Sequence, residues 1–307
     1  MPPEEHSVWS GVLVAITTPF GPDGTVDEPE LRRHADWLAA QGVDGILVGG
    51  SLGEGSSLSA DEHLALVSAL ATGLPTRVPV VAAVSALTTA EAVLRARRAR
   101  SAGARGLLVL PPYVYRGDRR EVRAHFSAVF GATDLPCMLY NNPVAYGTDV
   151  SAEEVLDLAT EHSTLSGVKE SSGDVRRITA LRSVLGDRVE VAVGLDDAAL
   201  EGARAGARGW VAGLANAFPS ESVALWGLAR HGPEERAAAL YRWFLPLLRM
   251  DSDPKFVQQI KLVTAERGFG HPRVRPPRLE LPEPERTATL ERLRVALAAE
   301  PPVPRAA

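Results

Sequence analysis

Lys169 lies at the end of a short apolar run, in the stretch Thr164-Leu-Ser-Gly-Val-Lys169-Glu-Ser-Ser-Gly-Asp174. An apolar run that emerges into Ser, Gly and Asp is typical of a buried strand that enters a loop. An amine placed there loses part of its hydration, which disfavours its charged form. Because a neutral amine is a nucleophile towards ketones, the position indicates Schiff-base chemistry. The alternative is a surface lysine paired with Glu170.

A second segment of interest is the loop Gly49-Gly-Ser-Leu-Gly-Glu-Gly55, which follows another apolar run. Four glycines allow the backbone to approach a ligand and to turn its amides inward, so the loop can hold a carboxylate. Ser51 adds a hydroxyl to it. The spacing does not fit a dinucleotide-binding fingerprint. An ordinary glycine-rich turn is the alternative interpretation.

The third segment is Tyr140-Asn-Asn-Pro143, at the end of the apolar run before that of Lys169. A tyrosine that ends a strand beside the strand of Lys169 can point into the same cavity, where its phenol can relay a proton. The alternative is a buried aromatic residue with a satisfied hydroxyl.

The elements that must position these residues follow an alternating pattern of short apolar and longer amphipathic runs. Strands are predicted at 11–16, 43–48, 78–83, 106–110, 137–140, 165–169, 189–193 and 209–212. Helices are predicted between them at 28–41, 60–72, 89–102, 121–132, 151–161 and 198–205. Several of these helices have a capping residue at or before the first turn, namely Asp27, Ser59, Thr88 and Ser151.

Repeated strand–helix units imply parallel strands joined by crossovers. Eight of them predict an α/β fold, an eightfold (β/α) TIM barrel with a C-terminal helical extension, in which the strand ends carry the chemistry. A doubly wound open sheet is the alternative. We expect residues 1–218 to form the barrel with the active site. Residues 219–307 are expected to form a helical region packed on it, with helices near 221–230, 233–250, 253–267 and 287–299 and a disordered tail at 301–307.

Composition narrows the possible partners. The chain has 307 residues, 45% hydrophobic, with a net charge of −5. It contains neither a basic stripe nor a polybasic cluster, so we expect no nucleic-acid partner and no membrane partner. One cysteine, Cys137, permits no intramolecular disulfide and is expected in the core. The first ten residues lack a signal-peptide layout, which favours a soluble, cytoplasmic protein.

The sequence as a whole resembles the family of 4-hydroxy-tetrahydrodipicolinate synthase and N-acetylneuraminate lyase, from Gly11 to about Leu281. The motifs that carry the resemblance are Thr17-Thr-Pro-Phe20, Gly50-Ser-Leu-Gly-Glu54, Tyr140-Asn-Asn-Pro143, Gly167-Val-Lys-Glu-Ser-Ser-Gly-Asp174 and Val274-Arg-Pro-Pro-Arg-Leu279. The family implies a TIM barrel with a helical C-terminal region, assembled as a homotetramer (a dimer of dimers).

The resemblance also implies roles for individual residues. Lys169 forms the Schiff base, Tyr140 donates and accepts protons, and Ser51 hydrogen-bonds the tyrosine. Gly50, Ser51, Leu52 and Gly53 match the loop that holds the 2-oxo acid carboxylate, and Val211 matches a backbone position in the substrate pocket. No cofactor is implied. No metal is required, since the imine stabilises the developing charge, and the seven histidines show no ligand spacing.

Three departures separate this chain from the synthases of the family. The synthases have an arginine shortly after the Tyr-Asn-x-Pro motif, where it anchors the second substrate's carboxylate; here the sequence is Val144-Ala-Tyr-Gly147. Their adjacent threonines in the glycine loop are Ser51 and Leu52. Their Pro-Tyr-Tyr motif reads Pro112-Tyr-Val-Tyr115, so Val114 replaces the tyrosine that completes a relay across a subunit interface, unless Tyr115 takes its place.

These observations predict a class I, Schiff-base-forming lyase that acts on a 2-oxo acid. Pyruvate or a hydroxylated or sugar-derived 2-oxo acid is expected, and the enzyme would be an aldolase, dehydratase or deaminase. The first alternative is the synthase itself, which condenses pyruvate with aspartate semialdehyde. The second is a non-catalytic binding protein on the same fold.

Overall fold

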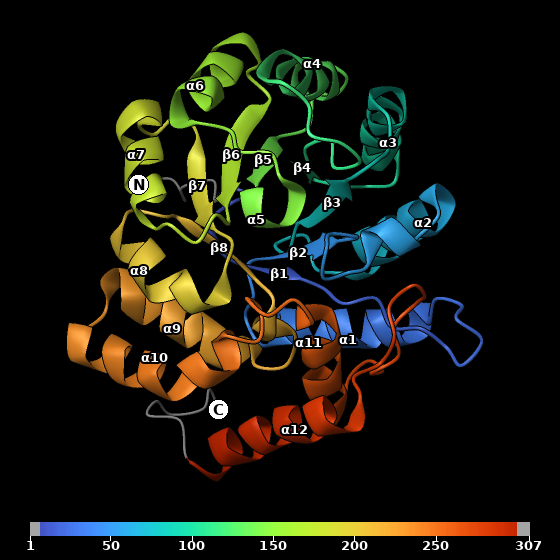
Figure 1. Cartoon of the computed structure of the whole chain (residues 1–307), viewed down its shortest axis with the longest axis vertical. Coiled ribbons are helices and arrows are strands. Elements are labelled where there is room, and N and C mark those ends of the chain that lie inside the picture. Colours follow the sequence, from blue (N-terminus) through green and yellow to red (C-terminus); the bar gives the residue numbers. More distant parts are fainter. Residues whose placement is uncertain (1–6, 300–307) are drawn as a thin grey trace.

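A closed barrel of eight parallel strands forms the centre of the computed structural model, which describes residues 7–299 (Figure 1). The strands pair in chain order and β8 closes the ring on β1. They are β1 (Gly11–Ala15), β2 (Gly45–Val48), β3 (Val80–Val84), β4 (Gly106–Val109), β5 (Cys137–Asn141), β6 (Leu165–Glu170), β7 (Glu190–Val193) and β8 (Gly209–Ala212). The prediction of a TIM barrel is confirmed, and the alternative of an open doubly wound sheet is wrong.

Helices between successive strands cover the outside of the barrel, except for the four-residue α5, which lies over the carboxyl ends of the strands. They are α1 (Glu28–Ala40), α2 (Ala60–Gly73), α3 (Thr89–Ser101), α4 (Arg119–Phe130), α5 (Pro143–Tyr146), α6 (Ala152–Glu161), α7 (Arg176–Leu185) and α8 (Ala199–Arg204). The four predicted caps are confirmed: Asp27, Ser59, Thr88 and Ser151 each accept a hydrogen bond from a backbone N–H of the first helical turn.

Two helices, α5 and α7, were not predicted. Helix α5 has only four residues, too few to show a helical period. Helix α7 begins after Val175, which provides no side-chain cap, so the usual start signal is missing.

The C-terminal region consists of α9 (Pro219–His231), α10 (Glu234–Leu248), α11 (Phe256–Glu266) and α12 (Glu283–Ala298). Helix α9 follows β8 and packs on β1, as an outer helix of the barrel does. Helices α10, α11 and α12 lie to one side of the barrel (Figure 1). The division after residue 218 stays a proposal, and a boundary after His231 separates barrel and extension equally well. The predicted disordered tail lies outside the described residues.

A buried ion pair connects this C-terminal region to the glycine loop. The Lys261 ammonium in α11 donates a hydrogen bond to the Glu54 carboxylate at 2.7 Å, and both side chains are at most 1% exposed. The other carboxylate oxygen of Glu54 accepts the backbone N–H of Arg275 at 3.0 Å. Glu54 also has a left-handed backbone, with a φ of 53°. The end of β2 and the chain after α11 are therefore held together around one carboxylate.

Two further expectations concern single features of the chain. Cys137 is buried in β5, and burial raises the pKa of its thiol to about 12, so the predicted core position is confirmed. Within residues 7–299, no helix has both the length and the apolar character needed to cross a membrane.

Candidate active site

Lys169 and Tyr140 lie side by side at the carboxyl ends of neighbouring strands. They are register partners in the parallel pair β5–β6. The side-chain nitrogen of Lys169 lies 4.2 Å from the centre of the Tyr140 ring, over its face. Both side chains are buried, at 8% and 5% exposure. The structure thus brings the two predicted catalytic residues together in a place with little water.

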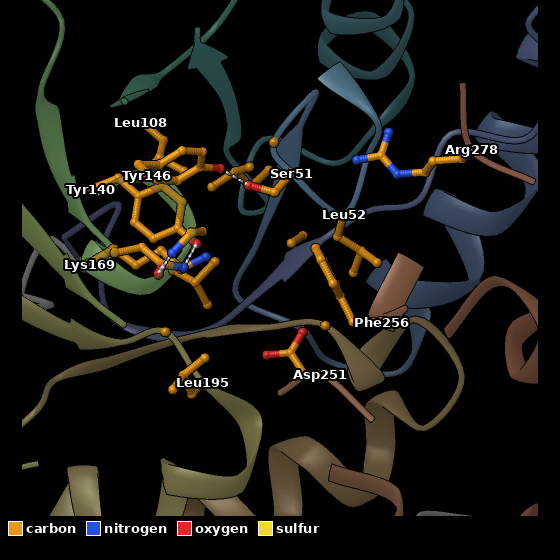
Figure 2. A pocket seen from close by; sticks show the side chains of 18 residues that line it. Ser51, Leu52, Leu108, Tyr140, Tyr146, Lys169, Leu195, Asp251, Phe256 and Arg278 are labelled. Carbon is orange, nitrogen blue, oxygen red and sulfur yellow. Dashed lines mark hydrogen bonds between the residues drawn. The ribbon is translucent and has the colours of Figure 1, made fainter. Parts of the chain in front are cut away.

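A cavity of about 240 Å³ opens beside this pair, at the carboxyl ends of the strands (Figure 2). Its wall includes most of the residues predicted to bind substrate, namely Gly50, Ser51, Leu52 and Val211. Gly53 is the exception and does not line the cavity. Its carbonyl accepts a hydrogen bond from the Thr18 hydroxyl at 2.7 Å, and a Cβ at this position would lie 2.9 Å from the Ile16 carbonyl oxygen, so Gly53 packs against the end of β1.

Two backbone amides of the glycine loop belong to residues that line the cavity. Among the described residues, no group accepts a hydrogen bond from the backbone N–H of Ser51 or Leu52, although both residues line the cavity. The loop is also too tight for side chains at its ends. A Cβ on Gly55 would lie 1.8 Å from the Gly49 carbonyl oxygen. Two unpaired amides in a compact loop form a suitable cradle for a carboxylate.

The partner of Ser51 differs from the prediction. Its hydroxyl is hydrogen-bonded to the phenol of Tyr146 and not to Tyr140 (Figure 2). The Tyr140 oxygen instead accepts a hydrogen bond from the Asn142 amide at 3.1 Å. The physical reason is the short helix α5, which places the Tyr146 ring edge-on to Tyr140, with centroids 5.6 Å apart, between that tyrosine and the loop.

Tyr146 was not singled out from the sequence, where it appeared only as part of a stretch lacking an arginine. Burial, and next the neighbouring Tyr140, raise the pKa of its phenol above the ordinary value, against a smaller effect of the bond to Ser51. Tyr146 therefore stays protonated and supplies a hydroxyl to the cavity. The ring of Tyr113 lies 6.2 Å from it, whereas Tyr115 is 57% exposed. Of these two tyrosines, Tyr113 is the one directed towards the site.

Two carboxylates near the cavity were also missed. Asp251, from the turn after α10, lines the wall below Lys169 in Figure 2. Asp196 is buried, its backbone N–H donates to the Asp251 carboxylate at 3.3 Å, and its own carboxylate accepts hydrogen bonds from the Trp210 indole and from the backbone N–H groups of residues 213 and 214. Burial raises the pKa of Asp196 to about 6. Burial, and next the charge of Asp196, raise the pKa of Asp251 well above its ordinary value, which favours a neutral acid facing the cavity.

Space for the lysine is provided by Gly194, just after β7. A Cβ at this position would lie 2.6 Å from Cε of Lys169 and 2.0 Å from the Ser171 hydroxyl oxygen. Any larger residue would therefore push the amine from its place beside Tyr140.

A buried lysine at the end of β6, facing a strand-end tyrosine in a TIM barrel, is the arrangement of a Schiff-base enzyme. Comparison with known proteins identifies the family. Residues 8–296 match the model of the dihydrodipicolinate synthetase family, and the chain belongs to that family as one of its lyases.

Relatives and solved structures agree with this assignment. The chain is 41% identical over 231 residues to a 4-hydroxy-tetrahydrodipicolinate synthase of Xanthomonas campestris, covering 75% of this chain and 76% of the relative. It superposes with a TM-score of 0.89 on a putative dihydrodipicolinate synthetase from Pseudomonas aeruginosa, at 35% identity, covering 94% and 99% of the two chains. A prophage protein of the same family from E. coli K12, solved in complex with pyruvate, gives a TM-score of 0.89 at 28% identity, with 95% and 100% covered.

Proposed function

We propose that this protein is a class I lyase that forms a Schiff base between Lys169 and a 2-oxo acid such as pyruvate. The observation that carries the proposal is the buried Lys169 nitrogen, 4.2 Å from the centre of the Tyr140 ring and beside the cavity. The family relative that was solved with pyruvate supports the choice of ligand.

The mechanism follows from the groups in the cavity. The amine nitrogen of Lys169 attacks C2 of the 2-oxo acid, and the carbinolamine loses water to give a protonated imine. The imine nitrogen accepts the electron pair of the C3–H bond, or of the C3–C4 bond, as that bond breaks. Tyr140 takes up or returns the proton, and the amides of Ser51 and Leu52 hold the C1 carboxylate.

The enamine that results has two onward routes. It can add to an aldehyde, or it can expel a hydroxyl or amino group from the next carbon, which takes its bonding electrons and a proton with it. Water then adds to the imine and releases the product from Lys169. Asp251 lines the same cavity as Lys169, and its raised pKa favours the protonated acid, so it is placed to protonate such a leaving group, which favours an elimination.

The second candidate is the synthase reaction, because relatives such as the Xanthomonas campestris protein carry that name. Three residues that differ from those of the synthases favour a 2-oxo acid reaction other than that of the synthase. The position at which the synthases have an arginine after Tyr-Asn-x-Pro lies in the stretch Val144–Gly147, where Ala145 lines the cavity. Leu52 removes a hydroxyl from the wall, and Val114 is 63% exposed. The substrate we favour is hydroxylated or sugar-derived.

The enzyme is further proposed to be a cytoplasmic homotetramer. Support comes from the family resemblance and from exposed apolar side chains near the site, with Val144 84% and Tyr115 57% exposed. Sedimentation at micromolar concentration should give four times the mass of the chain, and a monomer mass would contradict it.

Borohydride trapping tests the central proposal. Incubation with pyruvate and borohydride should add the mass of a reduced pyruvate adduct to the wild type and nothing to Lys169→Ala. Equal labelling of both proteins would refute the role of Lys169, and no labelling of either would refute the reaction, leaving the non-catalytic alternative. Efficient turnover of pyruvate with aspartate semialdehyde would establish the synthase instead.

A further inference from the structure

Two basic side chains line the cavity, and they come from opposite sides of it. Lys169 enters from β6, and Arg278 enters from the segment between α11 and α12 (Figure 2). The proposed function gives a role to Lys169 and to the glycine loop, which holds the C1 carboxylate, but gives none to Arg278. Arg278 was part of a motif in the sequence, but no role followed from the motif.

The guanidinium of Arg278 is free of the bonds that hold its neighbours. Arg273 donates to the Phe20 carbonyl at 2.8 Å. Arg275 donates to both carboxylate oxygens of Glu62 and to the carbonyls of residues 24 and 57. In contrast, no described group accepts a hydrogen bond from the Arg278 side chain. Its planar set of N–H donors is thus available to a ligand.

The nearest carboxylate, that of Glu54, does not neutralise the charge of Arg278. Glu54 lies 3.9 Å from it, at the limit of an ion pair. Glu54 already has a closer partner, since Lys261 lies at 2.7 Å and is as buried as the carboxylate. The Glu54–Lys261 pair is neutral overall, so Arg278 leaves a net positive charge at this end of the cavity. Its side chain is 29% exposed, which leaves it reachable from the cavity.

We propose that Arg278 binds a second anionic group of the substrate, on the side of the cavity opposite to Lys169 (Figure 2). The inference rests on the proposed function and narrows its substrate class. The substrate, or the aldehyde partner of the enamine, carries a carboxylate that the guanidinium holds by two parallel hydrogen bonds.

A matched pair of ligands tests the proposal without knowledge of the natural substrate. 2-Oxoglutarate and 2-oxopentanoate have the same chain length and differ by the distal carboxylate. The concentration that gives half-maximal borohydride trapping is measured for each. Wild type should trap 2-oxoglutarate at a concentration at least about tenfold lower, the effect of one charge-assisted bidentate contact. In Arg278→Met the ratio should fall to within about twofold of one.

Two further variants complete the design. Arg278→Lys keeps the charge without the fork and should retain part of the preference. Arg286→Met removes an exposed arginine of α12 and should keep the wild-type ratio. No preference in wild type, or a preference that survives in Arg278→Met, would overturn the proposal. The melting temperature of each variant shows whether it folds.

Failure of the imine chemistry is recognised separately. Lys169→Ala cannot form an imine, yet it keeps Arg278, so 2-oxoglutarate should still raise its melting temperature more than 2-oxopentanoate does. That difference should vanish in Lys169→Ala/Arg278→Met. An anion preference without trapping would refute the Schiff base alone, whereas trapping without the preference would refute the role of Arg278.

Discussion

The side-chain nitrogen of Lys169 and the ring of Tyr140 form a stacked pair across β5 and β6, 4.2 Å apart. The lysine nitrogen contacts the face of the ring, so the phenol oxygen remains available for proton transfer. Imine formation and proton transfer are thus assigned to adjacent residues, and a substitution can separate the two steps.

Tyr140→Phe should keep the imine and slow the proton transfer. The substitution preserves the ring face beside Lys169 and removes only the hydroxyl that Asn142 contacts. Borohydride trapping with pyruvate should continue, while exchange of the pyruvate methyl protons with deuterium should slow by about 10²–10⁴-fold. Exchange at the wild-type rate would assign the proton to another group.

Gly194→Ala should displace Lys169. The added methyl would lie 2.6 Å from Cε of the lysine, so the amine must move from its position beside Tyr140. We expect pyruvate trapping to slow by at least about 10²-fold, the effect of roughly 1 Å of misplacement. Gly227→Ala in α9 is the matched control, because nothing lies within 4 Å of a Cβ there. Equal trapping rates in the two variants would contradict the steric argument.

Ser51→Ala and Tyr146→Phe should have non-additive effects. Each substitution breaks the same hydrogen bond. The second substitution should therefore reduce the rate less in the double variant than it does in the wild type. In a double-mutant cycle on the rate of deuterium exchange into pyruvate, the coupling free energy should be about 0.5–3 kcal/mol. Additive effects would show that the two hydroxyls act independently.

Breaking the Glu54–Lys261 pair should destabilise the whole protein. Lys261→Met leaves the Glu54 carboxylate buried without its ammonium partner, at a cost of about 3–5 kcal/mol in the free energy of unfolding. The double variant Glu54→Gln/Lys261→Met removes both charges and should recover part of the loss. Urea unfolding followed by circular dichroism measures the free energy of unfolding of the single and the double variant. A single variant as stable as wild type would show that water reaches the pair.

His34→Gln should reduce the loss of stability in acid. His34 is buried and bonded to the Asn216 carbonyl at 2.8 Å, and burial lowers its pKa from 6.5 to about 4. Because the unfolded chain takes up the proton at higher pH, the stability that the neutral form provides is complete above about pH 6.5 and is lost as the pH falls towards 4. Between pH 7 and pH 5, this one group should cost about 2 kcal/mol.

Glutamine can donate the same hydrogen bond and does not titrate. Urea unfolding at pH 7 and pH 5 gives the change in the free energy of unfolding between these pH values for wild type and for His34→Gln. When the two changes are subtracted, the contributions of other groups, such as Asp196, cancel. Identical pH dependence in the two proteins would show that His34 is protonated or solvated in the folded state.

Lys169 and Tyr140 could be predicted because each ends an apolar run, and parallel strands in a barrel place their carboxyl ends at one mouth. The same local signals gave the strands and most of the helices. Tyr146 could not be found in this way, since its direction depends on a four-residue helix without a period. The pairing of Ser51 was wrong for that reason.

Asp251 and Arg278 were missed for a different reason. Both lie in non-helical segments of the C-terminal region, and their positions depend on how α10 and α11 pack on the barrel. Packing between distant segments leaves no spacing pattern in a sequence. The charge of Arg278 could be read, but only the Glu54–Lys261 bond shows that this charge is available to a ligand.

The bond between Glu54 and Lys261 also has a consequence for the order of synthesis. The glycine loop leaves the ribosome more than 200 residues before the lysine that neutralises its buried carboxylate. Until that lysine emerges, burial of the unpaired Glu54 carboxylate is unfavourable, so Glu54 stays hydrated and the loop does not close over the mouth of the barrel. A nascent chain that contains all eight strands is therefore still without a finished substrate pocket, and the active site is completed only by the last third of translation.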